Sequence, residues 1–408
     1  MSKNSPLNEH QKEVKSMTIE IEPIDPLFFR DGRPFGGPGD HWADSFGFPL
    51  PSTIYGALLG KYISKNCGVE ELEKLWKEKK KVDTDLEIEF VYFCPVTIRF
   101  SPATKEIKEI SEIVYFPAPR DYVKEKKSGK FRALKMTEDK NWINTITSLK
   151  FIFLSPVKGE VETVDENMFL EDSFLDSYEE QEKISFNSFP FIFEPKMGIG
   201  LNKFRRAVEE NKIYRVSFRR YENFENGVSH KLRIGVKFKG LNIPKEGILK
   251  LGGEGKSAKY QIAETEPEIL SETIKLEGRG LLKFYLTTPV IFEKGWIPDF
   301  LKDENREWKG DLLLEKKDGE KVEINLSLKG AVIGKPLYVG GWDIVAGIPK
   351  PMFRAVPAGS VYLFEYKLSS PIEVKRVQKM LFNPSQTDLS EQFKKEGFGI
   401  GILINQSQ

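Results

Sequence analysis

The sequence predicts an α+β protein made of two ferredoxin-like (RRM-like, βαββαβ) domains with glycine-rich loops and long insertions. Both halves of the chain start with a strand-like segment that runs into a proline-containing turn, at residues 18–24 and 281–292. Both halves end on a helical segment, a glycine-rich loop and a strand, and the two loops occupy residues 252–255 and 397–401. The halves share this order of elements but not their residues, which indicates a repeated architecture.

The domain division follows from composition. The 408 residues are enough for two or three domains with cores of their own. Residues 1–16 are polar and lack a visible secretory signal, so we expect a flexible tail. An N-terminal domain enlarged by insertions is expected over residues 17–277, and a C-terminal domain over residues 278–408. The junction is expected within residues 267–277.

The individual elements follow from local residue preferences. A helix is expected from Ser52, a suitable N-cap in front of an apolar segment. Further helical segments are expected over residues 69–81, 244–251 and 386–395. Strands are expected where β-branched and aromatic residues cluster, at residues 18–24, 86–100, 213–221, 232–239, 258–264, 281–292, 361–366 and 402–404.

The loop between the first strand and the first helix has an unusual composition. Pro26 ends the strand because proline has no N–H to donate to a neighbour. Residues 30–35 (RDGRPF) then form a charged turn, and residues 36–39 add three glycines around a proline. Six aromatic residues between positions 28 and 48 argue against disorder. We therefore expect a shaped binding loop.

Charge is balanced overall but unevenly distributed. The net charge is +1, with 39% hydrophobic and 30% charged residues, which is typical of a soluble globular protein. No apolar run reaches the roughly 20 residues of a membrane helix. Basic residues gather at 120–135 and 196–220, and acidic residues at 160–182. Local basic patches on a neutral protein favour a specific nucleic-acid groove over nonspecific coating. The two cysteines, Cys67 and Cys94, indicate reduced thiols in a cytoplasmic protein.

Three glycine-rich segments are candidates for phosphate contact, because glycine lets a backbone approach a phosphate closely. They cover residues 197–200, 252–255 and 397–401, and the first lies beside a basic cluster. The alternative is that they are tight turns between packed elements. None matches the P-loop or the dinucleotide-binding fingerprint. The last is faintly similar to an RNA-recognition octapeptide, but Glu396 stands where a basic residue belongs, so base stacking is not expected there.

His41 is the only histidine in a position that suggests chemistry. It lies between Asp40 and Trp42 in the shaped loop. A metal-independent ribonuclease could use it as general acid or base. The absence of a partner histidine favours hydrogen bonding or base contact instead. Metal ligation by Asp40, His41 and Asp44 is a further, weaker alternative, and no cofactor is expected.

Taken together, these motifs resemble the third subunit of the Cmr complex, the type III-B CRISPR effector built from RAMP proteins. The resemblance covers residue 17 to the C-terminus and rests on residues 26–35 (PLFFRDGRPF), 51–57, 196–201 (KMGIGL), 251–255 (LGGEG), 341–343 (GWD) and 356–362 (VPAGSVY). It implies two ferredoxin-like domains in a cytoplasmic subunit for antiviral defence. It implies as partners the 5′ repeat-derived tag of the guide RNA, the large polymerase-like subunit and neighbouring RAMP subunits, without a membrane.

The resemblance also implies a role and a set of contacts. The assembled complex cleaves target RNA, whereas this subunit is expected to bind RNA without catalysis. The alternatives are a metal-independent guide-processing endoribonuclease that uses His41, and a purely structural adaptor. The implied tag contacts are Arg30, Arg33, His41, Gly198, Gly200, Asn202, Lys203, Arg205, Arg206, Gly252, Gly253 and Gly255.

Overall fold

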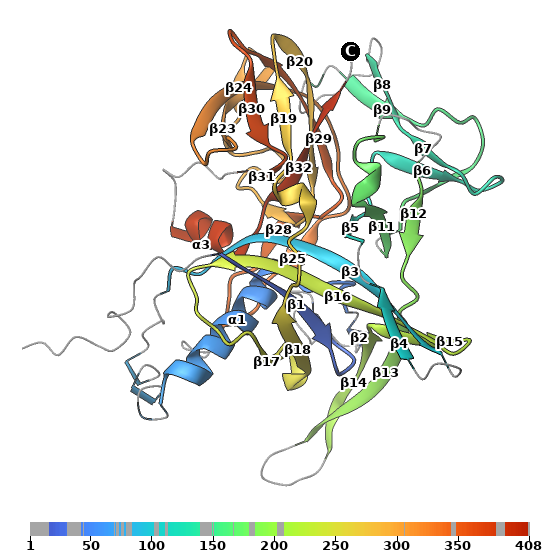
Figure 1. Ribbon diagram of the computed structural model, residues 1–408, viewed down its shortest axis with the longest axis vertical. Helices are drawn as coiled ribbons and strands as arrows, with labels where there is room; N and C mark the ends of the chain where they lie inside the picture. The colour runs from blue at the N-terminus through green and yellow to red at the C-terminus, as the bar shows by residue number, and fades with distance from the viewer. Residues whose placement is uncertain are drawn as a thin grey trace, which may run out of the picture.

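The computed structural model shows a chain dominated by antiparallel β-sheet (Figure 1). It describes residues 16–406 except for 31–41, 44, 69, 71–72, 75–76, 79–83, 102–105, 111–112, 139–148, 150, 166, 179–183, 202–207, 306, 344–347 and 381–387. Two large sheets organise the described residues, one in the lower and one in the upper part of Figure 1.

The first sheet has ten strands, eight of which run in the order β12-β11-β5-β3-β16-β1-β18-β17. Two more strands pair at its side, β15 with β16 and β4 with β3. All these pairs are antiparallel. The strands are β1 (Met17–Pro23), β3 (Glu87–Ser101), β4 (Glu106–Ile110), β5 (Tyr115–Pro117), β11 (Met168–Glu171), β12 (Phe186–Ser188), β15 (Glu222–Glu225), β16 (Val228–Lys239), β17 (Glu246–Lys250) and β18 (Ser257–Ile262).

The second sheet has seven antiparallel strands in the order β22-β23-β24-β29-β20-β32-β31. They are β20 (Arg279–Leu286), β22 (Lys302–Glu304), β23 (Glu307–Glu315), β24 (Lys321–Val332), β29 (Val361–Lys367), β31 (Val377–Lys379) and β32 (Ile400–Gln406).

Smaller sheets and single turns complete the described fold. The ribbon β13 (Ile192–Leu201), β14 (Val208–Arg220) and β2 (Trp42–Ala43) extends below the first sheet in Figure 1. The other small sheets are β10 (Val161–Thr163) with β6 (Tyr122–Glu125) and β7 (Phe131–Ala133), β8 (Lys135–Glu138) with β9 (Phe151–Leu154), β19 (Thr273–Leu276) with β30 (Ile372–Lys375), β21 (Val290–Ile291) with β28 (Phe353–Val356) and β25 (Leu337–Val339), and β26 (Trp342–Asp343) with β27 (Ile348–Pro349). Short 3-10 turns are η2 (Asp172–Phe174), η3 (Gly253–Gly255) and η4 (Glu268–Leu270).

The prediction of two βαββαβ domains is wrong, because the described residues are mainly strand, and the α-helices whose bounds are described are α1 (Pro51–Asn66) and α3 (Asp388–Glu396). Residues 244–251, expected to be helical, contain strand β17. Gly247 at its centre disfavours a helix, and its backbone pairs with Tyr260 of β18 instead. In the second half, the hairpin β23–β24 follows β20 at the point where the βαββαβ order requires its first helix.

The first helix also begins differently from the prediction. Helix α1 starts at Pro51 with Leu50 as its N-cap, and no side chain caps it, so the assignment of Ser52 as the cap is wrong. Proline suits the first helical position because its fixed φ is already helical and its missing N–H is not needed there. The expected helix at 386–395 is confirmed as α3. Within the expected helix at 69–81, the described residues 70, 73, 74 and 77 are helical, and most of the others lie outside the described residues.

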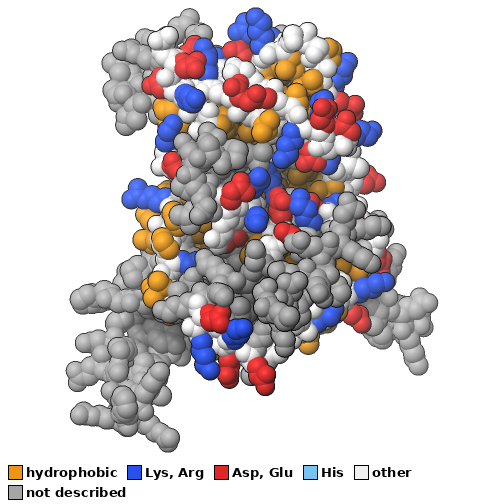
Figure 2. Space-filling model, turned by 90° about the vertical axis from the view of Figure 1, so that its left-hand side faces the viewer, with side chains coloured by type: hydrophobic (Ala, Val, Ile, Leu, Met, Phe, Trp, Pro, Cys, Tyr) orange, Lys and Arg blue, Asp and Glu red, His pale blue; other side chains and the backbone are white. Residues whose placement is uncertain are grey.

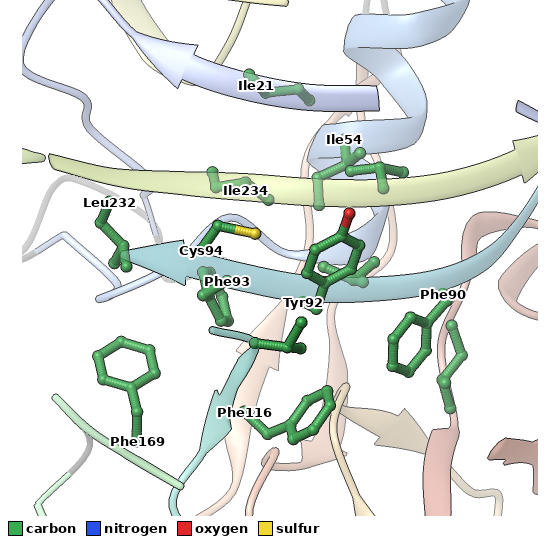
Figure 3. Close-up of a cluster of buried hydrophobic side chains, with 14 of the residues drawn as sticks. Ile21, Ile54, Phe90, Tyr92, Phe93, Cys94, Phe116, Phe169, Leu232 and Ile234 are labelled. Atoms are coloured by element: carbon green, nitrogen blue, oxygen red, sulfur yellow. The ribbon is translucent and has the colours of Figure 1, made fainter. Parts of the chain in front are cut away.

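One hydrophobic core joins the two sheets. Buried side chains of β1, β3 and β16 pack around Ile54 of α1, and Figure 3 shows this cluster with Tyr92 and Phe93 at its centre. The same cluster includes Tyr285, Ile400 and Ile402 from the second sheet. The domain division at residue 278 stays a prediction, because side chains from both sides of it share this core.

A buried polar contact lies between the same two parts of the chain. The Lys283 ammonium on β20 pairs with the Asp121 carboxylate at 3.2 Å, and both side chains are almost fully buried. The Tyr178 hydroxyl donates to the same carboxylate. Burial and the nearby Asp121 charge raise the pKa of Tyr178, which keeps this hydroxyl a donor.

Candidate nucleic-acid interface

The structure describes about half of the predicted contact residues. Arg30, Gly198, Gly252, Gly253 and Gly255 are described, and Gly200 is placed as backbone in β13. The other six, Arg33, His41, Asn202, Lys203, Arg205 and Arg206, lie outside the described residues.

The long ribbon β13–β14 carries the glycine segment at residues 197–200. Its strands pair antiparallel, with Lys196 opposite Val216 and Gly198 opposite Tyr214. Strand β2 belongs to the shaped loop between β1 and α1, which we call the aromatic–arginine loop. It pairs parallel with β14 through Trp42 and Ala43. The predicted contacts fall in three segments: the loop between β1 and α1, residues 197–200 and residues 252–255. The first two of these lie in one small sheet on either side of β14, although more than 150 positions separate them in the sequence.

The third segment joins the same place through residues 27–29. Leu27 and Arg219 exchange backbone hydrogen bonds of 2.8 Å in both directions. The Gly253 N–H donates to the Phe28 carbonyl at 2.9 Å, and the Phe28 ring lies 5.5 Å from the Phe218 ring. Phe28, Val216 and Phe218 form a separate small apolar cluster. The residues next to all three segments therefore pack around the buried rings of Phe28 and Phe218.

The turn at residues 252–255 is shaped by this packing. Gly252 has φ +80°, and a Cβ there would lie 2.7 Å from the Phe28 carbonyl oxygen, so a larger residue does not fit. The Gly253 N–H is occupied by that same carbonyl. Gly255 differs, because it has φ +62° and a Cβ built on it meets open space. Of these three glycines, Gly255 presents the accessible backbone.

Two lysines next to these glycines were missing from the predicted contacts. The Lys196 ammonium lies 4.4 Å from the centre of the Phe218 ring, and the Lys256 ammonium lies 5.2 Å from it. The Phe218 side chain is fully buried, so the lysines cover it and carry their charge at the surface. Lys196 directly precedes the first glycine segment and Lys256 directly follows the turn, which was the available sequence signal.

The arginines of this region divide into structural and exposed ones. Arg219 is buried, and its guanidinium donates to Asn167 Oδ1 at 2.7 Å and to the Ser45 carbonyl at 3.1 Å. It also lies 5.0 Å from the Phe193 ring. Arg219 therefore anchors β14 to the base of the aromatic–arginine loop. Arg30 is exposed at the other side of that base, where its backbone bridges to Ser45.

The ribbon also exposes apolar side chains. Phe193 is 53% exposed and Met197 is 75% exposed. Arg220 is bound to Glu194 at 2.6–2.7 Å, which neutralises one cation of the basic run. Side chains alternate between the two faces of a strand, so Phe193 and Met197 lie on the face opposite Lys196. The ribbon therefore offers a lysine on one face and apolar side chains on the other, and both kinds of group suit single-stranded nucleic acid.

Other site chemistry has little support in the described chain. Within those residues, no three His, Cys, Asp or Glu side chains come together as metal ligands would. No helix formed by the described residues is long and apolar enough to cross a membrane. Cys67 and Cys94 are buried free thiols, and burial raises the pKa of Cys94 far above its usual value.

A family model supplies the identification. The model described as CRISPR-associated protein (Cas_Cmr3) matches residues 19–406, almost the whole chain. The chain belongs to the Cmr3 family. This confirms the resemblance to the third Cmr subunit that the sequence motifs indicated.

Two solved structures are similar to this Cmr3-family chain over most of its length. One is described as the type III-B Cmr-beta complex bound to cognate target RNA and AMPPnP, and the other as Cmr-beta bound to cognate target RNA. Both are 17% identical and cover 85% of this chain and 86% of theirs, with TM-scores of 0.39 and 0.37. No curated protein matches the sequence. The family assignment rests on the family model.

Proposed function

We propose that this chain is a non-catalytic, RNA-binding subunit of a type III-B CRISPR RNA-guided complex that targets RNA in antiviral defence. In this role it holds the 5′ tag of the guide RNA, docks on the large polymerase-like subunit and neighbouring RAMP subunits, and works in the cytoplasm. The observation that carries the proposal is the convergence of three separate segments, with Lys196 and Lys256, on the Phe28–Phe218 pair.

The proposed attraction between this surface and RNA is electrostatic. Two lysine ammonium groups at one buried ring create a local positive potential on a chain of net charge +1. Phosphates of a single strand would bind there by releasing counterions. The open backbone at Gly255 allows a phosphate or sugar to approach without meeting a side chain. On the opposite face of the ribbon, exposed Met197 and Phe193 offer apolar surface to any base that reaches around it.

The twelve predicted contacts remain part of the proposal, with two refinements. Lys196 and Lys256 join them as phosphate contacts. Gly252 and Gly253 act by shaping the turn. The Phe28 carbonyl leaves no room for a Cβ at Gly252, and it accepts the hydrogen bond from the Gly253 N–H.

The test is the salt dependence of tag-RNA binding to the purified chain, measured by fluorescence anisotropy. The double variant Lys196→Ala, Lys256→Ala should bind more weakly. Its log–log salt slope should be flatter by about 0.7 for each lost phosphate contact, about 1.4 in total. Lys302→Ala, a change of an exposed lysine on β22, is the matched control and should leave the slope unchanged. A double variant with the wild-type slope would contradict the proposed interface.

A further inference from the structure

A large polar cavity lies between the two main sheets, away from the ribbon. Its volume is about 470 Å³, within the range of roughly 300–1,000 Å³ found for ligand pockets. Its wall combines the start of β3, the end of β16, the hairpin β23–β24, strand β31 and helix α3. Figure 2 views the side of the molecule that carries α3 and shows basic and acidic side chains intermingled at mid-height. We call this cavity the inter-sheet cleft.

Cations outnumber carboxylates in the cleft wall. Six lysines line it, Lys237, Lys239, Lys321, Lys375, Lys379 and Lys394, against three glutamates, Glu87, Glu89 and Glu315. Two more carboxylates from outside the wall reach it, because Glu266 pairs with Lys237 at 2.8 Å and Glu391 pairs with Lys394 at 3.7 Å. A positive excess remains after these pairs.

The pairing within the wall is uneven. Glu87 pairs with Lys239, at 3.0 Å, and with Lys379, and Glu89 gives Lys239 a second carboxylate at 3.4 Å. Glu315 serves Lys375. For Lys321, no carboxylate of the described residues lies within ion-pair distance. A crease that only joined two sheets would gain most from matched pairs, whereas this one leaves the Lys321 ammonium group without a carboxylate among the described residues, at the wall of an open polar cavity.

Lys379 lies deepest among these groups. Its side chain is 15% exposed and touches both Glu87 and the Lys394 carbonyl. Burial lowers its pKa despite the opposing effect of Glu87, and Lys239 lowers it further. A desolvated ammonium group beside another cation is stabilised when an anion arrives.

We propose that the inter-sheet cleft binds a compact polyphosphate anion, either inorganic polyphosphate or the phosphate chain of a nucleotide. The lysines reach the cleft from five different elements, so one anion with several charges satisfies more of them than a single carboxylate does. Lysine binds phosphate as a flexible point charge, which fits a site without arginine. This site is separate from the proposed RNA interface and does not depend on it.

The experiment is calorimetric titration of the full chain at low ionic strength with tripolyphosphate, ATP and adenosine. We expect saturable binding of both anions and none of adenosine. Equal affinities would identify inorganic polyphosphate as the better match, and tighter binding of ATP would identify a nucleotide. Lys321→Met, a change of an exposed side chain, should weaken binding at least 10-fold, as should Lys379→Met. Lys302→Met, outside the cleft, should bind like the wild type.

Two results would overturn the proposal. One is the absence of saturable binding for both anions, and the other is equal binding by Lys321→Met and Lys302→Met. The double variant Lys196→Ala, Lys256→Ala distinguishes anion binding in the inter-sheet cleft from binding at the proposed RNA interface. It should keep its affinity for tripolyphosphate, and a loss there would place the anion at the ribbon and refute the cleft site. Failure of the RNA proposal would leave the cleft result unchanged.

Discussion

The glycine-rich segments at residues 252–255 and 397–401 look alike in the sequence and differ in what surrounds them. In the second, Gly399 donates to the Pro289 carbonyl, and a Cβ on Gly401 would lie 2.3 Å from the Phe284 ring. That segment is packed where the chain enters β32, a buried strand between β20 and β31 in the second sheet. In the first, Gly255 faces open space and Lys256 covers the Phe218 ring. Glycine content alone therefore does not distinguish a packed segment from one that is open to a ligand. The side chains around the segment make that distinction.

The largest effect is expected at the buried segment. Gly401→Val would place a branched side chain against Phe284 and the Tyr285 carbonyl. Such overpacking should lower the free energy of unfolding by about 3 kcal/mol. Chemical denaturation followed by far-UV circular dichroism measures this. A variant as stable as the wild type would mean that the segment is not packed as described.

An effect of similar size on stability is expected in acid, at Glu22 of β1. Glu22 at the end of β1 is buried, which raises its carboxyl pKa, but hydrogen bonds from Lys231, Arg233 and Lys259 outweigh this and lower the pKa to about 2. Because the folded pKa is below the unfolded value, the stabilisation is present above about pH 4.5 and is lost as the pH falls toward 2. At neutral pH it amounts to about 3 kcal/mol.

The variant Glu22→Gln checks this contribution. It should be less stable than the wild type at pH 7, and the difference should shrink as the pH falls from 4.5 toward 2. Stability is measured by denaturant titration across this range, with Glu246→Gln on exposed β17 as the control. A gap that stays constant with pH would show that the Glu22 charge is not what stabilises β1.

The smallest change in stability but the clearest change in binding is expected at Gly255. Gly255→Ala meets no neighbouring atom and costs only the strain of φ +62°, about 1 kcal/mol. If RNA approaches this backbone, the added methyl group should still weaken tag-RNA binding several-fold. Gly227→Ala, in a turn with φ +79° and no neighbouring atom, is the matched control for strain alone. Equal RNA affinity in both variants would show that RNA does not contact Gly255.

Sequence patterns predicted strands better than their arrangement. The apolar clusters at 86–100 and 232–239 correspond to β3 and β16, and the 386–395 helix to α3. The 244–251 segment was misassigned because pairing with β18 is not visible in a local pattern. Element order suggested βαββαβ units, but β17 and the hairpin β23–β24 occupy the places of two of the four helices that this requires. The resemblance to the family was visible in the motifs, because the residues of each motif are adjacent in sequence.

The candidate site was predictable only in part for the same reason. The glycines and the basic run at 196–220 are local signals. The meeting of Phe28 with Phe218, and the two lysines over that ring, depend on the register of β14 and on the Leu27–Arg219 bridge. A sequence of one chain does not contain such long-range pairing in readable form, so Lys196 and Lys256 were missing from the predicted contacts.

The most direct test of the central claim is photocrosslinking of assembled complexes that carry a 4-thiouridine-labelled guide tag, with the adducts mapped by mass spectrometry. The account predicts adducts in residues 192–198, 215–220 or 251–256, and their loss in the Lys196→Ala, Lys256→Ala variant. Adducts confined to other parts of the chain, or a chain that yields none while neighbouring subunits are labelled, would contradict it.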